Sequence, residues 1–117
     1  MNIIYLHGFQ SSALSIKGQQ LKQYFAGNNA VTVHLPDLNQ APLQVMQQMS
    51  ALTESLQNVT LVGSSLGGFY ATQLVAKYGV PAVLINPAMR PWQLFRELFA
   101  EADLPYQVTP DWVLDNI

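Results

Sequence analysis

A serine flanked by glycines stands at the centre of residues 61–69, Leu-Val-Gly-Ser-Ser-Leu-Gly-Gly-Phe. The pattern Gly63-x-Ser65-x-Gly67 follows a short apolar run and precedes a helical pattern. In that context it is typical of a nucleophile elbow, a sharp strand-to-helix turn that presents a serine hydroxyl above a sheet. We expect Gly63 and Gly67 to brace the turn, because a Cβ at either position would collide with a neighbouring element. The pattern predicts Ser65 as a nucleophile; a plain glycine-rich turn is the alternative.

A serine nucleophile also needs donors for the negative charge that develops on the attacked carbonyl. Leu66 is expected to begin a helix, so its backbone N–H would point at that charge with the helix dipole behind it. A second backbone N–H is expected from Phe9, in the loop that follows His7 and Gly8. Phe9 and Leu66 are therefore predicted to form an oxyanion hole, with Gly8 and a hydrogen bond from His7 bracing its loop.

Alternating apolar and amphipathic segments must position these residues. Four buried strands are predicted, at residues 3–6, 30–35, 59–62 and 82–86. Four helices are predicted, over residues 16–26, from Pro42, over residues 66–78, and from Pro91, where Trp92, Phe95, Leu98 and Phe99 share one face. Beyond Asp103, Pro105 and Pro110 predict no regular element. The alternation indicates an α/β fold, a parallel sheet with right-handed crossovers and helices on both faces.

Ligands of such sheets bind beyond the carboxyl ends of the strands, at the point where the strand order reverses. The loop that begins at His7 and the turn around Ser65 both follow predicted strands. If the first and third strands are neighbours, these two segments lie side by side at that point.

Composition limits the other possibilities. The chain has 117 residues, half of them apolar and 10% charged, which predicts one compact domain over residues 1–117. A net charge of −2 without a basic cluster argues against nucleic acid and anionic membranes as partners. There is no cysteine, and the two histidines lack metal-site spacing, so we expect no metal and no cofactor. No run approaches membrane-spanning length and no basic leader is present, which predicts a cytoplasmic protein.

Three motifs resemble the YqiA-type esterases, small bacterial proteins with an α/β-hydrolase fold. The motifs are residues 6–12 (Leu-His-Gly-Phe-Gln-Ser-Ser), residues 62–72 around Ser65, and residues 85–91 (Ile-Asn-Pro-Ala-Met-Arg-Pro). They occur in the right order, and the resemblance covers essentially the whole chain. It implies a three-layer α/β-hydrolase-like sheet with strand order two, one, three, four. It also implies hydrolysis of short-chain carboxylic esters, or of related small acyl compounds, through an acyl-enzyme on Ser65.

The chain departs from that family in one respect. In α/β-hydrolases the catalytic serine is followed along the chain by an acid and then a histidine. No histidine follows Ser65, and none of the later acids matches the family's catalytic acid. His7 is expected to brace its loop, and His34 to have a structural role at the sheet edge. The chain is thus interpreted as the N-terminal portion of such a fold, lacking the C-terminal strands, and is expected to be nearly inactive.

Two further expectations follow from this interpretation. The fourth strand would lack its outer neighbour, and an unpaired apolar edge predicts self-association. The alternative function is a catalytically inactive fragment or a module that binds a small ligand or a partner. A flavodoxin-type binding protein is disfavoured, because the loop from Gly8 to Ser12 lacks the phosphate-binding pattern.

Overall fold

The computed structural model describes residues 1–8, 12, 14–87, 106–109 and 112–114. The elements in chain order are β1 (Asn2–Leu6), α1 (Ile16–Tyr24), β2 (Thr32–His34), α2 (Pro42–Ser55), β3 (Val59–Ser64), α3 (Leu66–Tyr78), β4 (Ala82–Ile85), β5 (Tyr106–Thr109) and β6 (Trp112–Leu114). Each strand and helix expected before residue 87 is present, and α3 has the predicted bounds. The helix expected from Pro91 lies outside the described residues.

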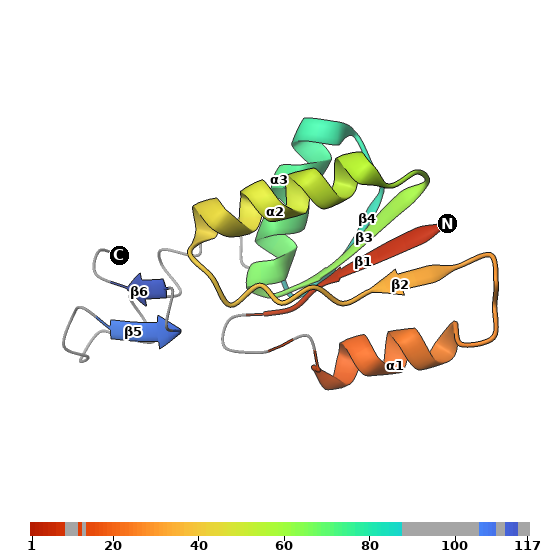
Figure 1. The fold of residues 1–117 in the computed structure, drawn as a ribbon, viewed down its shortest axis with the longest axis horizontal. Coiled ribbons are helices and arrows are strands. Elements are labelled where there is room, and N and C mark those ends of the chain that lie inside the picture. Colours follow the sequence, from red (N-terminus) through yellow and green to blue (C-terminus); the bar gives the residue numbers. More distant parts are fainter. Residues whose placement is uncertain (9–11, 13, 88–105, 110–111, 115–117) are drawn as a thin grey trace.

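The main sheet has four parallel strands in the order β2-β1-β3-β4 (Figure 1). This order is the one that the family resemblance implies, and it places β1 and β3 side by side. In the register, Leu6 is opposite Gly63, and Ser64 is opposite Ile85. The carboxyl ends of β1, β3 and β4 therefore meet at one end of the sheet, as expected for a ligand site in a parallel sheet.

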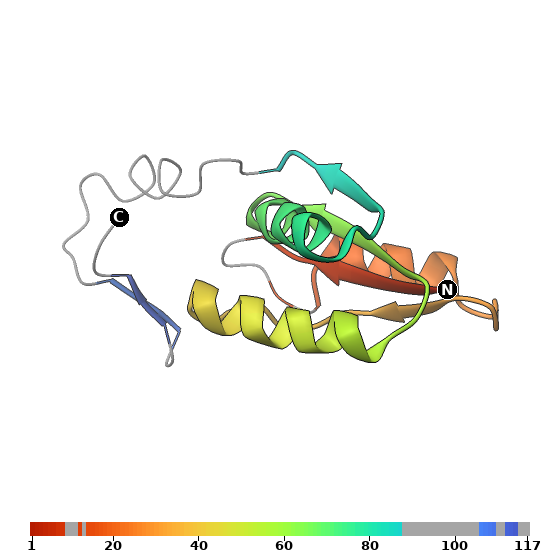
Figure 2. The ribbon, with the colours of Figure 1, turned by 90° about the horizontal axis from the view of Figure 1, so that it is seen from above.

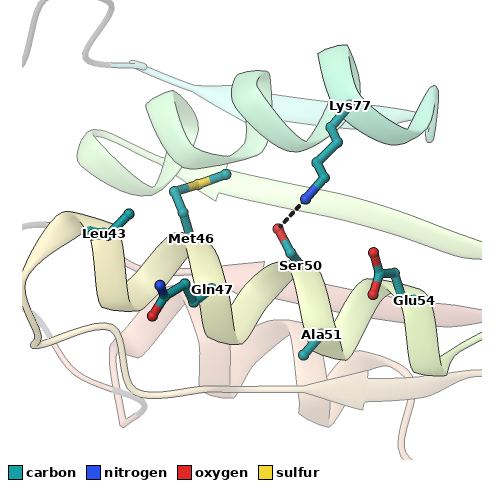
Figure 3. Close-up of a pocket in the computed structure, with 7 residues that line it drawn as sticks. All are labelled: Leu43, Met46, Gln47, Ser50, Ala51, Glu54 and Lys77. Atoms are coloured by element: carbon teal, nitrogen blue, oxygen red, sulfur yellow. Dashed lines mark hydrogen bonds between the residues drawn. The ribbon is translucent and has the colours of Figure 1, made fainter.

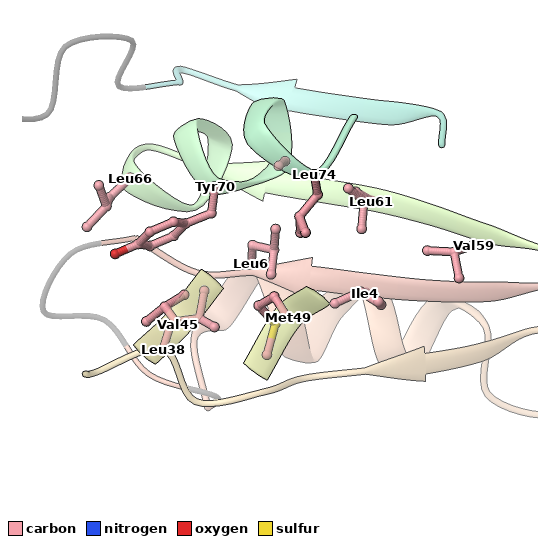
Figure 4. Close-up of a cluster of buried hydrophobic side chains, with 11 residues drawn as sticks. Ile4, Leu6, Leu38, Val45, Met49, Val59, Leu61, Leu66, Tyr70 and Leu74 are labelled. Carbon is pink, nitrogen blue, oxygen red and sulfur yellow. The ribbon is translucent and has the colours of Figure 1, made fainter. Parts of the chain in front are cut away.

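Helices cover both faces of this sheet, with α1 on one face and α2 and α3 on the other (Figures 1 and 2). The α1 face receives Ile3 and Tyr5, and a Cβ on Gly18 would lie 3.1 Å from the Tyr5 ring. The opposite face holds the main core (Figure 4), whose buried members are Ile4, Leu6, Leu38, Val45, Met49, Val59, Leu61, Leu66, Tyr70, Ala71 and Leu74. The three-layer α/β architecture is thus confirmed.

Strand β4 forms one edge of the sheet. Among the described residues it pairs with β3 alone, and Val83 and Leu84 are 55% and 41% exposed. The opposite edge, β2, is shorter and carries the polar residues Thr32 and His34. The apolar edge expected at the fourth strand is therefore present in the described part of the chain, while self-association through it stays a prediction.

The tail corrects one expectation. The prediction of no regular element beyond Asp103 is wrong, because β5 and β6 pair as an antiparallel hairpin with a register shift between Gln107 and Thr109. In the sequence, Pro105 precedes β5 and Pro110 falls between the two strands. Prolines at those positions remove no N–H group from the ladder, so they bound the strands instead of preventing them.

Candidate active site

Ser65 occupies the turn between β3 and α3. Strand β3 ends at Ser64, α3 begins at Leu66, and Ser65 itself has φ 54° and ψ −118°. A positive φ is rare for a residue with a side chain and costs on the order of 1–3 kcal/mol. The predicted strained strand-to-helix turn is confirmed, and its geometry presents the Ser65 side chain at the carboxyl end of the sheet.

Two backbone hydrogen bonds hold the strained turn. The Ser65 N–H donates to the Ile85 carbonyl across the β3–β4 boundary, at 3.0 Å. The Ser65 carbonyl accepts from the Gly68 N–H, also at 3.0 Å. One bond ties the serine to the end of β4 and the other ties it to the first turn of α3, so its backbone is fixed from both sides.

The glycines of the motif lie where three backbones touch. A Cβ on Gly63 would be 2.6 Å from the Gly67 carbonyl oxygen. A Cβ on Gly67 would overlap the Leu6 carbonyl group and lie 2.7 Å from the His7 carbonyl oxygen. Real Cβ atoms do not approach backbone that closely, so β1, β3 and α3 can pack together here only because both residues are glycines.

The loop after β1 reaches the serine directly. A Cβ on Gly8 would lie 3.3 Å from the Ser65 Cβ and 3.9 Å from its Oγ. The N–H groups in the first turn of a helix have no intrahelical acceptor, and Leu66 is the first residue of α3. The structure thus brings Gly8, Ser65 and Leu66 together. Phe9, the other expected donor, lies outside the described residues.

His7 links the loop after β1 to the loop after β2. The Leu38 N–H donates to its Nε2 at 2.8 Å, and Nδ1 lies 2.9 Å from the Gly8 carbonyl oxygen. These partners assign the neutral ring with its proton on Nδ1, which donates to Gly8. The residue is 2% exposed, and the Asp37 carboxylate lies 3.7 Å from Nε2. Both ring nitrogens therefore hydrogen-bond to backbone groups, one to Gly8 beside Ser65 and the other to Leu38 in the loop after β2.

His34 takes no part in this arrangement. It pairs with Ile4 in the β1–β2 ladder, and its Nε2 lies 3.0 Å from the side-chain oxygen of Asn2, the first residue of β1. Asp37, a further polar residue of the sequence, accepts a hydrogen bond from the Asn39 N–H at 2.9 Å and so caps its own loop.

Sequence reasoning assigned no role to Asn86, Pro87 or the second glycine after the serine. A Cβ on Gly68 would lie 2.7 Å from the Pro87 Cβ, so the turn after β4 packs directly on the first turn of α3. Asn86 has φ 44°. The segment Ile85-Asn86-Pro87 was visible as a motif, but which residue it would pack against depends on the fold.

Tyr70 is a second residue that the sequence did not single out. Tyr70 is 1% exposed, and its hydroxyl has no hydrogen-bond partner among the described residues. The ring extends back along α3 towards Leu66, with the hydroxyl at the carboxyl end of the sheet (Figure 4). Burial raises the pKa of the Tyr70 hydroxyl well above its ordinary value, so the group stays protonated.

A surface groove of about 430 Å³ runs between α2 and α3 (Figure 3). It is lined by Leu43, Met46, Gln47, Ser50, Ala51, Glu54 and Lys77. The Lys77 ammonium donates to the Ser50 hydroxyl at 3.4 Å, and the Glu54 carboxylate accepts from the Tyr78 hydroxyl at 2.6 Å. Its charged groups are thus bonded within the protein, and its lining residues come from α2 and α3 and do not include Ser65.

Within the described part of the chain, no three His, Cys, Asp or Glu side chains gather as a metal site would require. The helices described there are also too short or too polar to cross a membrane.

The described parts of the three motifs, which include residues 6–8 and 85–87, meet at one junction in the fold. Residues 6–8, the turn at Ser65 and the segment after Ile85 meet at the carboxyl ends of β1, β3 and β4. A family model described as "Uncharacterised protein family (UPF0227)" matches residues 2–116. That match covers almost the whole sequence and agrees with the resemblance carried by the motifs. The chain therefore belongs to the YqiA-like family UPF0227.

Proposed function

We propose that this protein is a serine esterase of the α/β-hydrolase type, with Ser65 as the nucleophile and a small carboxylic ester or acyl compound as substrate. The observation that carries the proposal is the strained turn at Ser65, with the Gly8 backbone packed against its side chain. A positive φ at a non-glycine residue persists only where the surroundings enforce it. Here β1, β4 and α3 all do so.

In the proposed reaction, the Ser65 Oγ attacks the ester carbonyl carbon. The carbonyl oxygen gains the electron pair and accepts hydrogen bonds from the Leu66 N–H and, as the sequence predicts, from the Phe9 N–H. Collapse of this intermediate breaks the C–O bond to the leaving alkoxide, which takes up the proton lost by Ser65, and leaves an acyl group on Ser65. Water then attacks the acyl carbon, which releases the carboxylic acid and returns a proton to the Ser65 oxygen. The positive end of the α3 dipole stabilises the negative charge in both steps.

The proton of the Ser65 hydroxyl needs an acceptor. In α/β-hydrolases a histidine that follows the serine along the chain accepts it, and this chain has none at such a position. His7 is held by Leu38 and Gly8, and His34 contacts Asn2. We therefore expect slow turnover by the chain alone. In a known serine-protease triad, the loss of a catalytic residue leaves roughly 10³–10⁴-fold acceleration over water.

A fluorophosphonate probe tests the proposal, because it reports on the nucleophile without requiring turnover. We expect labelling of the protein and of Ser64→Ala, and no labelling of Ser65→Ala. Ser64 is the matched control, since it is the preceding residue and lies in the regular β3 ladder. Labelling of Ser65→Ala would place the nucleophile elsewhere. A folded protein that is never labelled would favour a non-catalytic module that binds a ligand or partner.

A second measurement follows acyl transfer itself. Hydrolysis of short-chain p-nitrophenyl esters should be slow and should disappear in Ser65→Ala, while Ser64→Ala retains it. A cytoplasmic location, with no metal or cofactor in the reaction, belongs to the same proposal.

A further inference from the structure

Asn86 follows β4 directly and has an unusual backbone conformation. Among the described residues, three that are not glycine have a positive φ: Asn58 at 53°, Ser65 at 54° and Asn86 at 44°. Ser65 and Asn86 stand at the carboxyl ends of the neighbouring strands β3 and β4. Asn58 precedes β3 and lies at the opposite end of the sheet.

The ladder places Asn86 beside the serine. Ser64 is opposite Ile85, and the Ser65 N–H donates to the Ile85 carbonyl. Asn86 is the next residue, so it flanks Ser65 on the β4 side. Because β3 lies between β1 and β4, the Gly8 loop flanks Ser65 on the other side. An ester whose carbonyl oxygen points towards the Gly8 loop would thus direct another substituent towards Asn86.

Packing holds Asn86 in a conformation that its sequence disfavours. The residue before a proline is biased towards extended conformations, although asparagine tolerates a positive φ better than most residues with a side chain. Pro87 is fixed against α3, since a Cβ on Gly68 would lie 2.9 Å from the Pro87 Cα. The contact between Pro87 and the first turn of α3 therefore constrains the turn at Asn86.

Asn86 is exposed, and among the described residues its carboxamide has no hydrogen-bond partner. A carboxamide offers both an N–H donor and a C=O acceptor. In the free protein water hydrates this exposed carboxamide, and a polar ligand at Ser65 would take the place of that water.

We propose that Asn86 is a specificity-determining residue, whose carboxamide hydrogen-bonds an oxygen-bearing substituent of the ester held at Ser65. The preferred substrate class is then a short ester with a hydroxyl or ether oxygen near the reacting carbon, in place of a plain alkyl ester. This inference rests on the proposed function of Ser65 and deepens it.

Two fluorophosphonate probes of equal chain length test the inference, one with an alkyl chain and one with an oligoethylene glycol chain. The readout is the ratio of their second-order labelling rates at Ser65. We expect Asn86→Gly, which tolerates the positive φ and removes the carboxamide, to lower the polar-to-alkyl ratio about tenfold, the effect of one hydrogen bond. Asn58→Gly is the matched control, because it removes the same exposed carboxamide from a positive-φ position and should leave the ratio unchanged.

The possible outcomes separate the two proposals. If the labelling rates of both probes fall equally in Asn86→Gly, or neither rate falls, Asn86 only shapes a turn and the inference is wrong. The role of Ser65 then still stands. If the unmodified protein is labelled by neither probe, the proposed function fails and the inference fails with it. Thermal unfolding of both variants close to that of the unmodified protein would show that the fold is intact.

Discussion

The two ends of the central sheet place different demands on the sequence. At the carboxyl end, a Cβ on Gly67 would overlap the backbone of β1. At the amino end, Gly79 ends α3 with φ 67° and ψ 22°, and apart from its chain neighbours no described residue lies within 4 Å of the position that its Cβ would occupy. Gly67 is required because there is no room for a Cβ, whereas Gly79 is favoured because its φ is positive. The difference shows that close backbone packing is concentrated at the end that carries Ser65.

The two histidines differ in how strongly they are held, although His34 is the last residue of β2 and does not lie at the amino end of the sheet. His7, at the carboxyl end, is 2% exposed and contacts backbone atoms of two loops. His34 makes one contact with a side chain, that of Asn2, and is half-buried. A group that satisfies a buried backbone N–H is harder to replace than one that contacts a partly exposed amide. The loops around Ser65 thus depend on interactions that their own backbone cannot supply.

The largest expected effect is at the glycines. Gly67→Ala should lower the free energy of unfolding by about 4 kcal/mol or more, because the added methyl group forces β1 and α3 apart. Gly79→Ala should cost only about 1–2 kcal/mol, the penalty of a positive φ with open space around it. Urea unfolding followed by circular dichroism measures both. Similar losses of unfolding free energy in the two variants would show that backbone packing is no tighter at the carboxyl end of the sheet than at the amino end.

The histidines are expected to give the next largest effect. His7→Ala leaves the Leu38 N–H buried without an acceptor and opens a cavity, so we expect a loss of about 3 kcal/mol. His34→Ala removes one partly exposed hydrogen bond, and should cost about 1 kcal/mol. The same unfolding measurement compares them. A greater loss in His34→Ala would show that the link between the loops after β1 and β2 contributes little.

Local patterns predicted the main elements of the fold. The run of apolar residues before Gly63, the helical pattern after it and the glycine beyond Tyr78 were enough to place α3 at its observed bounds. The strained conformation of Ser65 was also predictable, because Gly-x-Ser-x-Gly between a strand and a helix has few other solutions. The strand order came from the family resemblance, since pairing between distant segments is not encoded in any short pattern.

Other features depend on contacts between distant residues and could not be predicted. The packing of Gly68 on Pro87 requires β4 to lie next to β3, and the acceptor role of His7 requires the loop that contains Leu38 to fold over it. The hairpin of β5 and β6 is also hidden from local patterns, because Pro105 and Pro110 break a strand only if they lie within it, and the sequence alone does not show that they flank the strands. Spacing along the chain carries none of this information.

The smallest expected effect separates two tyrosines of α3. The Tyr78 hydroxyl, towards the amino end of the sheet, donates to Glu54 at 2.6 Å, whereas the Tyr70 hydroxyl is buried with no partner among the described residues. Removing a bonded hydroxyl costs about 1 kcal/mol, so Tyr78→Phe should destabilise the protein by that amount. Tyr70→Phe should be neutral or stabilise it by up to about 1 kcal/mol, because an unsatisfied buried group is replaced by an apolar one of the same shape.

The pH dependence of stability provides a second test of Tyr70. Burial raises its pKa in the folded protein, so above the ordinary tyrosine value of about 10 the folded state keeps a proton that the unfolded chain has lost. The unfolded state then binds fewer protons, and the free energy of unfolding falls as the pH rises. Tyr70→Phe removes this contribution, so its stability advantage over the unmodified protein should grow above pH 10.

Urea unfolding at pH 8 and pH 10.5 measures this stability advantage, with Tyr78→Phe as control. A destabilised Tyr70→Phe at pH 8, or an advantage that does not grow with pH, would mean that the hydroxyl is bonded or hydrated in solution.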